Sequence, residues 1–306
     1  MSYFYDLGIA WEWEYDFDFV NLILQRCKEK QLKVCGITPE NLSEIFNAVK
    51  RGDINFLAYF DRASDVNESF ADLNLLIESL GVRVINRYGD MIRASDKATM
   101  HLELLNAGVS LPYTLILPPF DESPDIKIDG EILNKIKIPF IVKPSSETGG
   151  GIGVKIGYSI DDIIEARKEF PYDKYLIQEI IQPVYIDGRK AWFRVFYAFG
   201  KVLICWWDNE IKIYEKLKSE ELEKYELGGI EDVMRKIYSV CKLDFFSSEV
   251  ALAVKDGKRK FISVDYVNEI PDMRLKSKAI DGVPDEVVEI GKKIYIPSFY
   301  SVKNFT

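Results

Sequence analysis

The residues best suited to chemistry form a glycine-rich segment near the middle of the chain. Residues 139–156 read as a short buried strand ending at Lys143, a Ser/Thr/Gly loop and a second strand. Three consecutive glycines, Gly149, Gly150 and Gly151, allow positive φ angles and a close approach to a ligand. Backbone N–H groups beside a lysine are suited to phosphate oxygens. The segment therefore predicts a loop that folds over a triphosphate, with a flexible surface hairpin as the alternative.

The spacing of this loop excludes two other kinds of nucleotide-binding loop. It is not a Walker loop, because no Gly-Lys-Ser/Thr closes it and a strand follows where a helix should. Its glycines also lack the G-x-G-x-x-G spacing of dinucleotide-binding loops. The interpretation that remains is a glycine-rich loop joining two strands.

A second group of chemically capable residues lies in a predicted hairpin over residues 248–268. If Gly257 marks the centre of the turn, Glu249 and Asp265 lie directly opposite each other, and the other face is apolar. Like charges across a ladder repel, whereas Mg²⁺ prefers carboxylate oxygens and bridges readily to phosphates. A metal site is therefore one interpretation, and a solvated face is the other. Under strict alternation Asn268 points away, so it can be a ligand only if the strand ends just before it.

The chain has a single histidine, His101, and this excludes much chemistry. Ser-His-Asp catalysis, Cys-His catalysis and multi-histidine metal sites are all disfavoured. Any reaction must depend on lysine, arginine, carboxylates and a hard cation. Arg194 shares a predicted strand face with Trp192 and Phe196, where it is either a stacked structural residue or an anion clamp.

Composition limits the class of protein. The 306 residues are 47% hydrophobic and 29% charged, with 40 Lys+Arg, 49 Asp+Glu, a net charge of −9 and a pI near 5.0. An acidic surface argues against a broad nucleic-acid site. Four scattered cysteines suit free thiols in a reducing compartment, and neither a signal peptide nor a membrane-spanning run is recognisable. We therefore expect a cytoplasmic protein that binds neither nucleic acid nor membrane.

The order of the predicted elements indicates an N-terminal domain over residues 1–94. Strands are predicted over residues 7–13, 32–37, 56–60 and 82–86, and helices over residues 17–30, 41–50 and 69–80. Such alternation favours a parallel sheet with helices on its faces and a ligand crevice at the carboxyl ends of the strands. Trp11, Glu12 and Arg62 are the candidates to line that crevice.

The remaining elements divide into two further predicted domains, residues 95–182 and 183–306. An exposed, proline-rich connection is expected at residues 118–129. Helices are predicted over residues 97–107, 159–170, 215–225 and 231–241, and strands over residues 115–117, 175–181, 191–199 and 202–207.

The order of these motifs resembles the ATP-grasp superfamily, and most of all its glutathione synthetase-like and ribosomal-protein glutamate ligase-like branch. The resemblance spans roughly residues 80–290 and rests on Ser95-Asp-Lys97, Leu111-Pro-Tyr-Thr114, the segment around Lys143, Gln178-Glu-Ile180, Arg194, Glu249 and Asp265-Tyr-Val-Asn268. It implies an α/β (α+β) class, with a Rossmann-like N-terminal domain followed by a two-lobed ATP-grasp fold.

The resemblance also implies ATP and Mg²⁺ as cofactors, and it assigns the nucleotide-binding residues. Lys97 and Lys143 would bind the α- and β-phosphates, while the glycine loop would close over the triphosphate. A hinge strand would present backbone groups to adenine, and a downstream carboxylate would reach the ribose. These remaining nucleotide residues are Gln178, Glu179 and Ile180 at the hinge and Asp187 at the ribose.

The metal ligands and catalytic residues follow from the same resemblance. Glu249, Asp265 and Asn268 would hold Mg²⁺, although the last two are one residue further apart than in the usual Glu-x-Asn, and Glu249 replaces the usual aspartate. Arg194 would meet the γ-phosphate and the acyl-phosphate formed from it. Independently of the resemblance, Arg274 shares one side of a predicted extended segment with Lys276 and Lys278, and it is the candidate to bind an anionic substrate.

The resemblance implies an ATP-dependent carboxylate–amine ligase that forms an acyl-phosphate and releases ADP and phosphate. Its substrates would be an amine and a small carboxylic acid, amino acid or peptide, and a homodimer is common among such enzymes. The alternatives are a nucleotide-binding module without catalysis and a small-molecule kinase similar to inositol polyphosphate kinases. A kinase of that kind needs a basic acceptor pocket, for which the sequence offers only Arg62, Arg274, Lys276 and Lys278.

Overall fold

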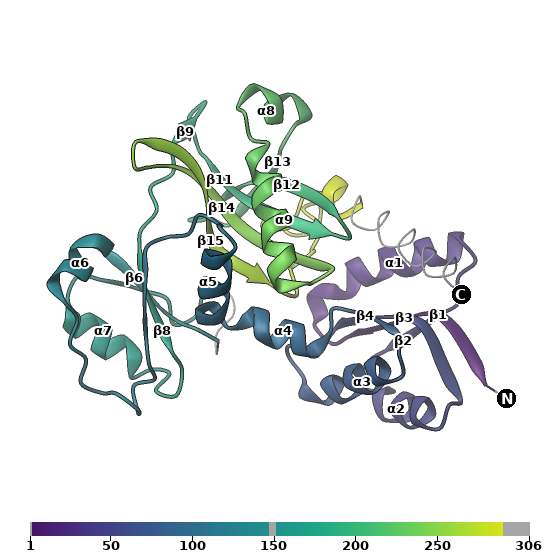
Figure 1. Cartoon of the computed structure of the whole chain (residues 1–306). Helices are drawn as coiled ribbons and strands as arrows, with labels where there is room; N and C mark the ends of the chain where they lie inside the picture. The colour runs from purple at the N-terminus through teal and green to yellow at the C-terminus, as the bar shows by residue number, and fades with distance from the viewer. Residues whose placement is uncertain (1, 147–150, 290–306) are drawn as a thin grey trace.

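The structure is a computed structural model, and it describes residues 2–146 and 151–289. Three parts follow one another along the chain, each built on its own sheet (Figure 1). We call them the N-terminal domain (residues 3–85), the lid (residues 114–179) and the C-terminal lobe (residues 185–268). Two helices over residues 88–106 connect the first part to the second.

The N-terminal domain is a parallel sheet with helices on both faces, as the sequence predicts. Its strands are β1 (Tyr3–Trp11), β2 (Val34–Ile37), β3 (Ile54–Arg62) and β4 (Arg83–Ile85), in the order β2-β1-β3-β4. A 3₁₀ turn, η1 (Glu14–Asp16), leads into α1 (Phe17–Glu29), which packs on one face. The other face is covered by α2 (Leu42–Lys50) and α3 (Glu68–Ser79).

Two consecutive helices, α4 (Tyr88–Ser95) and α5 (Lys97–Asn106), connect this domain to the lid. The sequence analysis missed α4, which is only two turns long. Asp96 separates the helices because its backbone is extended, and its carboxylate caps α5 by accepting from the N–H groups of Ala98 and Thr99. The start of α5 at Lys97 is therefore set by a local signal in the sequence.

The lid is a four-stranded sheet with helices on one face only. Its strands are β5 (Thr114–Leu117), β6 (Phe140–Pro144), β7 (Lys155–Gly157) and β8 (Tyr175–Glu179), in the order β5-β8-β6-β7, and its helices are α6 (Gly130–Ile136) and α7 (Ile160–Arg167). Ser159 begins α7 with a capping box to Asp162, as predicted. The short helix α6 was not predicted. No helix of the described residues belongs to the core on the other face, so among these residues that face is left to a ligand.

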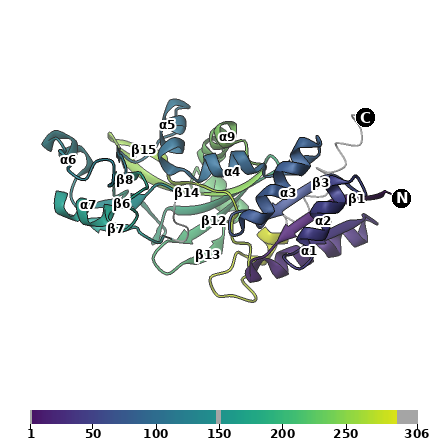
Figure 2. The same cartoon turned by 90° about the horizontal axis from the view of Figure 1, so that it is seen from below.

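The C-terminal lobe is an antiparallel sheet of five long strands. These are β11 (Trp192–Ala198), β12 (Lys201–Asp208), β13 (Ile213–Lys216), β14 (Phe245–Lys255) and β15 (Lys258–Asn268), in the order β13-β12-β11-β14-β15. The smaller elements are β9 (Tyr185–Ile186), β10 (Arg189–Lys190), α8 (Ser219–Lys224) and α9 (Gly229–Cys241). Helices α4, α5 and α9 lie on one side of β14 and β15 (Figure 2), and they share one core with them.

The helix predicted over residues 215–225 is wrong in its first half. Glu215 and Lys216 belong to strand β13 and pair with Trp206 and Cys205 of β12. The helix α8 begins only at Ser219. A charged segment that suits an exposed helix also suits an edge strand, and tertiary pairing decided between them.

Arg62 has a structural position, contrary to the expectation that it lines the substrate crevice. Its side chain is 1% exposed and forms a bidentate ion pair with Asp16, with Nε 2.8 Å from the carboxylate. It also donates to the carbonyl of Pro271 at 2.9 Å, and its guanidinium lies 5.1 Å from the ring centroid of Phe19. Arg62 therefore joins the N-terminal domain to the segment that follows β15.

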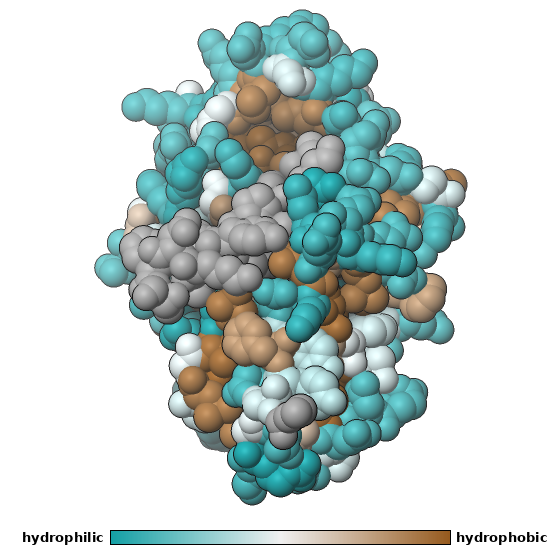
Figure 3. Space-filling view, turned by 90° about the vertical axis from the view of Figure 1, so that its right-hand side faces the viewer, coloured by the Kyte–Doolittle hydropathy of each residue, from teal (hydrophilic) through white to brown (hydrophobic). Residues whose placement is uncertain are grey.

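The described helices include none long and apolar enough to cross a membrane. On the face shown in Figure 3, hydrophilic residues interrupt the hydrophobic groups, which is the ordinary pattern of a protein surface.

Breaking the buried ion pair should destabilise the protein strongly. Arg62→Ala leaves the Asp16 carboxylate buried without its counter-ion, so we expect the free energy of unfolding to fall by about 3–5 kcal/mol. The matched control is Arg51→Ala, which removes an ion pair whose side chains are 64% and 52% exposed and should cost less than about 1 kcal/mol. Urea unfolding followed by circular dichroism measures both losses. Equal losses would contradict the structural role of Arg62.

Candidate active site

Three charged side chains lie in one row across the C-terminal sheet. Arg194 of β11 pairs directly with Glu249 of β14, which pairs in turn with Asp265 of β15. Directly paired residues point to the same face of a sheet. Helices α4, α5 and α9 cover the opposite face, and the face that carries the row packs in part against α1 and the segment that follows β15. The predicted juxtaposition of the two carboxylates is confirmed.

The turn that produces this juxtaposition differs from the predicted one. It consists of Asp256 and Gly257, both at positive φ (53° and 72°), and the first pair is Lys255 with Lys258. One extra β15 residue, Val264, then shifts the register and brings the two carboxylates opposite each other. The predicted pairing was correct although the predicted turn centre was not.

A second bulge places Asn268 on the same face. Ser247 pairs with Asn268 and Glu249 pairs with Asp265, so one residue of β14, Ser248, lies opposite two residues of β15. The extra residue reverses the side to which Asn268 points. We expected Asn268 to point away unless the strand ended before it. The strand continues through it, and the bulge accommodates the longer spacing of the motif.

Both oxygens of the Glu249 carboxylate are engaged within this row. Oε1 accepts from Arg194 Nη1 at 2.9 Å and Oε2 accepts from Trp192 Nε1 at 2.9 Å. Burial disfavours the arginine charge, but acidic neighbours, namely Tyr214, Glu249 and Asp265, raise the pKa of Arg194 above its usual value. Arg194 therefore stays cationic beside the predicted metal ligands.

Lys143 extends from the lid toward the same hairpin. Its side chain is buried, and its Nζ lies 3.5 Å from the Val264 carbonyl and 5.4 Å from the ring centroid of Tyr266. The pKa of Lys143 is lowered to about 8, mainly by burial and in part by nearby Lys97, whereas Asp265 and Glu249 oppose the shift. The bulge in β15 thus lies beside the end of β6, where the glycine loop begins.

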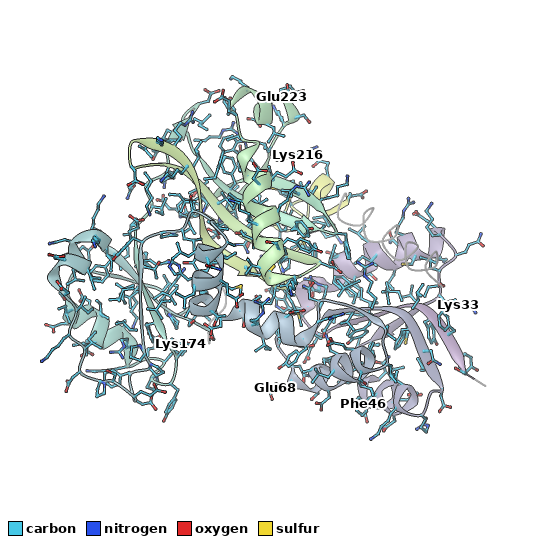
Figure 4. All side chains as sticks on the ribbon, in the orientation of Figure 1. Lys33, Phe46, Glu68, Lys174, Lys216 and Glu223 are labelled. Carbon is cyan, nitrogen blue, oxygen red and sulfur yellow. The ribbon has the colours of Figure 1, made fainter. Side chains whose placement is uncertain are left out.

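The second predicted phosphate-binding lysine is positioned by contacts between α5 and the lid. The backbone N–H and the Nζ of Lys97 both donate to the carbonyl of Ser145, at 3.1 and 3.3 Å. Asp96 accepts from Ser145 Oγ and from Lys174 Nζ, the latter at 2.6 Å. Figure 4 shows Lys174 where the lid approaches α5. Because Ser145 follows Lys143 by two residues, these contacts bring the two lysines together.

The side chains of the predicted hinge residues are occupied within the protein. Gln178 Nε2 donates to Tyr266 Oη at 2.5 Å, and Glu179 Oε1 accepts from Lys255 Nζ at 2.5 Å. Ile180 directly follows β8 and is half-buried. The strand is held by both the lid and the C-terminal hairpin, and the expectation that its backbone groups bind a base stays a prediction.

The sequence analysis missed an apolar set on the free face of the lid. Ile156 pairs with Ile141, which lies two residues before Lys143, so both isoleucines share the face of that lysine. Val154, Ile156 and Tyr158 are 44%, 56% and 60% exposed. Alternating apolar residues were visible in the sequence and could have indicated this surface. It suits a planar base bound beside Lys143, the predicted phosphate-binding lysine.

Two predicted site residues make contacts elsewhere. Asp187 lies in the β9–β10 turn, where it accepts from Lys224 Nζ at 3.0 Å and from Tyr225 Oη. Arg274 donates to Asp272 at 2.8 Å and to Asp281 at 2.9 Å. Their assignment to the ribose and to an anionic substrate stays a prediction.

The glycine loop is only partly described. Gly149 and Gly150 lie outside the described residues, and Gly151 has a positive φ of 87°. That backbone conformation agrees with the expected use of glycine in this loop.

The predicted metal ligands offer oxygen donors of the kind that Mg²⁺ prefers. Two carboxylates, Glu249 and Asp265, and the carboxamide of Asn268 share one face of the sheet. Across residues 2–146 and 151–289, no three acidic, histidine or cysteine side chains gather where a metal could be held. The predicted site would take its third protein donor from the carboxamide, and phosphate oxygens and water would complete the coordination.

Comparison with solved structures shows which fold this chain has. No family model matches the sequence, and no curated protein matches it. D-Alanine–D-alanine ligase from Bacillus anthracis, solved with ATP, is 20% identical with a TM-score of 0.64, over 99% of this chain and 100% of that one. A RimK domain ATP-grasp protein from Sphaerobacter thermophilus is 16% identical with a TM-score of 0.62, over 94% and 98%. The chain has the ATP-grasp fold.

A third ATP-grasp structure extends the comparison. The ligase PsnB, in complex with the precursor peptide PsnA2 and AMPPNP, is 11% identical with a TM-score of 0.62, over 95% of this chain and 98% of that one. The ATP-grasp likeness thus includes the N-terminal domain as well as the two lobes. It confirms the predicted fold class.

The depressed pKa of Lys143 predicts a pH-dependent affinity for ATP. Because its pKa is about 8, the free protein loses this charge as the pH rises above 8. Phosphate binding favours the charged form, so the Kd for Mg-ATP should increase by up to about tenfold per pH unit above 8 and change little below 7. Calorimetric titration from pH 6.5 to 9.5 measures this. Lys143→Arg keeps its charge and should flatten the profile; an unchanged profile would contradict the assignment.

The apolar set on the lid predicts a second effect on ATP binding. Ile156→Ser removes apolar surface from the wall proposed for the base, so affinity for Mg-ATP should fall by about 1–2 kcal/mol. Folding stability should hardly change, because Ile156 is 56% exposed without a ligand. Tyr172→Ser, at a residue that is 75% exposed and lies outside this set, serves as the control. Equal ATP affinity in both variants would contradict the hypothesis that this apolar set contacts the base.

Proposed function

We propose that the protein is an ATP-dependent carboxylate–amine ligase. The observation that carries the proposal is the row Arg194–Glu249–Asp265, with Lys143 extending to it from a separate lobe. This arrangement gathers cations and oxygen donors for a metal around one position. A nucleophilic side chain is not needed there, because the substrate carboxylate attacks the γ-phosphorus itself.

The proposed reaction has two steps. A carboxylate oxygen attacks the γ-phosphorus of ATP, the bond to the β-phosphate oxygen breaks, and an acyl-phosphate and ADP form. The amine then attacks the acyl carbon, a proton leaves the nitrogen, and inorganic phosphate departs. Bound Mg²⁺ would neutralise phosphate charge during the first step.

The residues of the site act on charge and position. Lys143 and Lys97 lie on different elements joined at Ser145, so they can hold the phosphates in a defined relation to the sheet. Arg194 remains cationic and can stabilise the transferred phosphoryl group. Closure of the lid would keep water from the acyl-phosphate.

The neighbouring structures suggest the range of acceptors. They include a D-alanine–D-alanine ligase, a D-Ala:D-Ser ligase, and a ligase and a macrocyclase each bound to a precursor peptide. We therefore propose an amino acid or a peptide as the carboxylate substrate of this protein.

The kinase alternative has less support. It requires cations free to bind a phosphorylated acceptor, and the four candidates are engaged within the protein. Arg62 pairs with Asp16, Arg274 with Asp272 and Asp281, and Lys278 with Asp18, while Lys276 donates to the carbonyl of Tyr214. An acceptor carrying several phosphates would have to displace these contacts.

A hydroxylamine trap tests the ligase directly. The protein is incubated with Mg-ATP, hydroxylamine and each of the twenty amino acids in turn, and with dipeptides. We expect ADP release together with a hydroxamate for at least one acid, because hydroxylamine captures an acyl-phosphate. A stable phosphorylated product in place of a hydroxamate would support the kinase. ATP binding without either product would contradict both enzymes.

Removing one metal-binding carboxylate should separate chemistry from nucleotide binding. Asp265→Asn should lower hydroxamate formation by about 100-fold or more, because a metal supplies several kcal/mol of transition-state stabilisation. Metal-free ADP should bind as in the wild type. Asp256→Asn alters an exposed turn residue paired with Lys260 and serves as the control. Equal activity of both variants would contradict the assigned metal site.

A further inference from the structure

Two buried donors on the paired strands β11 and β14, on the face of the charged row, have no hydrogen-bond partner among the described residues. They are the Nε of Arg194 and the hydroxyl of Ser247, a residue that is 0% exposed. A buried polar group without a partner costs about 1–3 kcal/mol and is rare in folded proteins. Two of them on neighbouring strands indicate a group that the described residues do not supply.

The strand register makes these donors neighbours. Arg194 pairs with Glu249, and Ser247 lies two residues before Glu249 on the same strand. Arg194 and Ser247 are therefore diagonal neighbours on one face, with backbones about 7–8 Å apart, within reach of a long side chain. Asn268 pairs with Ser247. Because Asn268 is one of the predicted metal ligands, Ser247 lies directly beside the predicted metal site.

The adjacent serine on the opposite face shows a different arrangement. Ser248 Oγ donates to the Asp265 carbonyl at 2.9 Å and lies 3.2 Å from Ser263 Oγ. Both of those hydroxyls are buried as deeply as that of Ser247, yet each has a partner. Buried serine hydroxyls in this hairpin can thus find hydrogen-bond partners among the described residues, but Ser247 has none among them.

We propose that Ser247 Oγ and Arg194 Nε bind the carboxylate of the acceptor, one donor to each oxygen. This rests on the proposed ligase function. Arg194 would bridge the site, with Nη1 on Glu249 and Nε on the acceptor, so the reacting carboxylate is held beside the metal ligands. Ser247 would contact the substrate directly, and its hydroxyl would orient the attacking oxygen without taking part in the phosphoryl transfer.

The first test is the stability of the protein without ligand. Ser247→Ala deletes a hydroxyl that has no partner, so its Tm should equal or exceed that of the wild type. Ser263→Ala is the matched control: it deletes an equally buried hydroxyl that has a partner, and its Tm should fall. A Tm lowered in Ser247→Ala as much as in Ser263→Ala would overturn the proposal, since the hydroxyl would then already serve the folded chain.

The second test measures carboxylate binding without turnover. The carboxyl resonance of [1-¹³C]acetate is followed by NMR with the protein loaded with Mg-ADP. We expect line broadening with the wild type and with Ser263→Ala, and an affinity lowered about tenfold in Ser247→Ala, as for a hydrogen bond to a charged group. Ser247→Thr keeps the hydroxyl and should restore binding. Equal broadening in wild type and Ser247→Ala would overturn the proposal.

The two proposals fail in distinguishable ways. Ser247-dependent acetate binding with no hydroxamate from any acid contradicts the ligase and leaves the carboxylate site standing. Hydroxamate formation with an unchanged KM for the acid in Ser247→Ala contradicts the carboxylate site and leaves the ligase standing. When both proposals hold, Ser247→Ala raises the KM for the acid about tenfold and leaves the KM for ATP unchanged.

Discussion

Glu249 and Asp265 lie opposite each other across an antiparallel pair, and this like-charge contact is the constraint that the rest of the site satisfies. Two carboxylates in that position repel. Arg194 offsets part of the charge through an ion pair at 2.9 Å, and a divalent cation would offset the rest. The surrounding cations therefore stabilise the sheet by offsetting this repulsion, in addition to their role in the proposed chemistry.

Those cations come from three separate elements. Arg194 lies on the C-terminal sheet, Lys143 on the lid and Lys97 on α5. Hydrogen bonds between Ser145 and the start of α5 join the last two. The lid contacts the C-terminal hairpin again where Glu179 pairs with Lys255. A polyanion bound by all three would hold these elements together, so in the proposed enzyme assembly of the site and closure of the lid would occur as one event.

Much of this arrangement could be predicted from the sequence, because it depends on local patterns. The alternation of strands and helices gave the parallel N-terminal sheet, and the Ser159 cap gave the start of α7. The paired carboxylates followed from the hairpin. What could not be predicted depends on register or on distant contacts. The two bulges in β15, the edge strand at Glu215 and the buried position of Arg62 are examples.

The double bulge in β15 has a consequence for how such chains evolve. A strand that can absorb one extra residue keeps its ligands on one face while the distance between them in the sequence changes. An insertion at this place is therefore neutral for the coordination geometry, although it breaks any pattern written with a fixed spacing. After such an insertion, a diverged protein no longer matches a sequence pattern of fixed spacing, although it keeps every donor atom of the site.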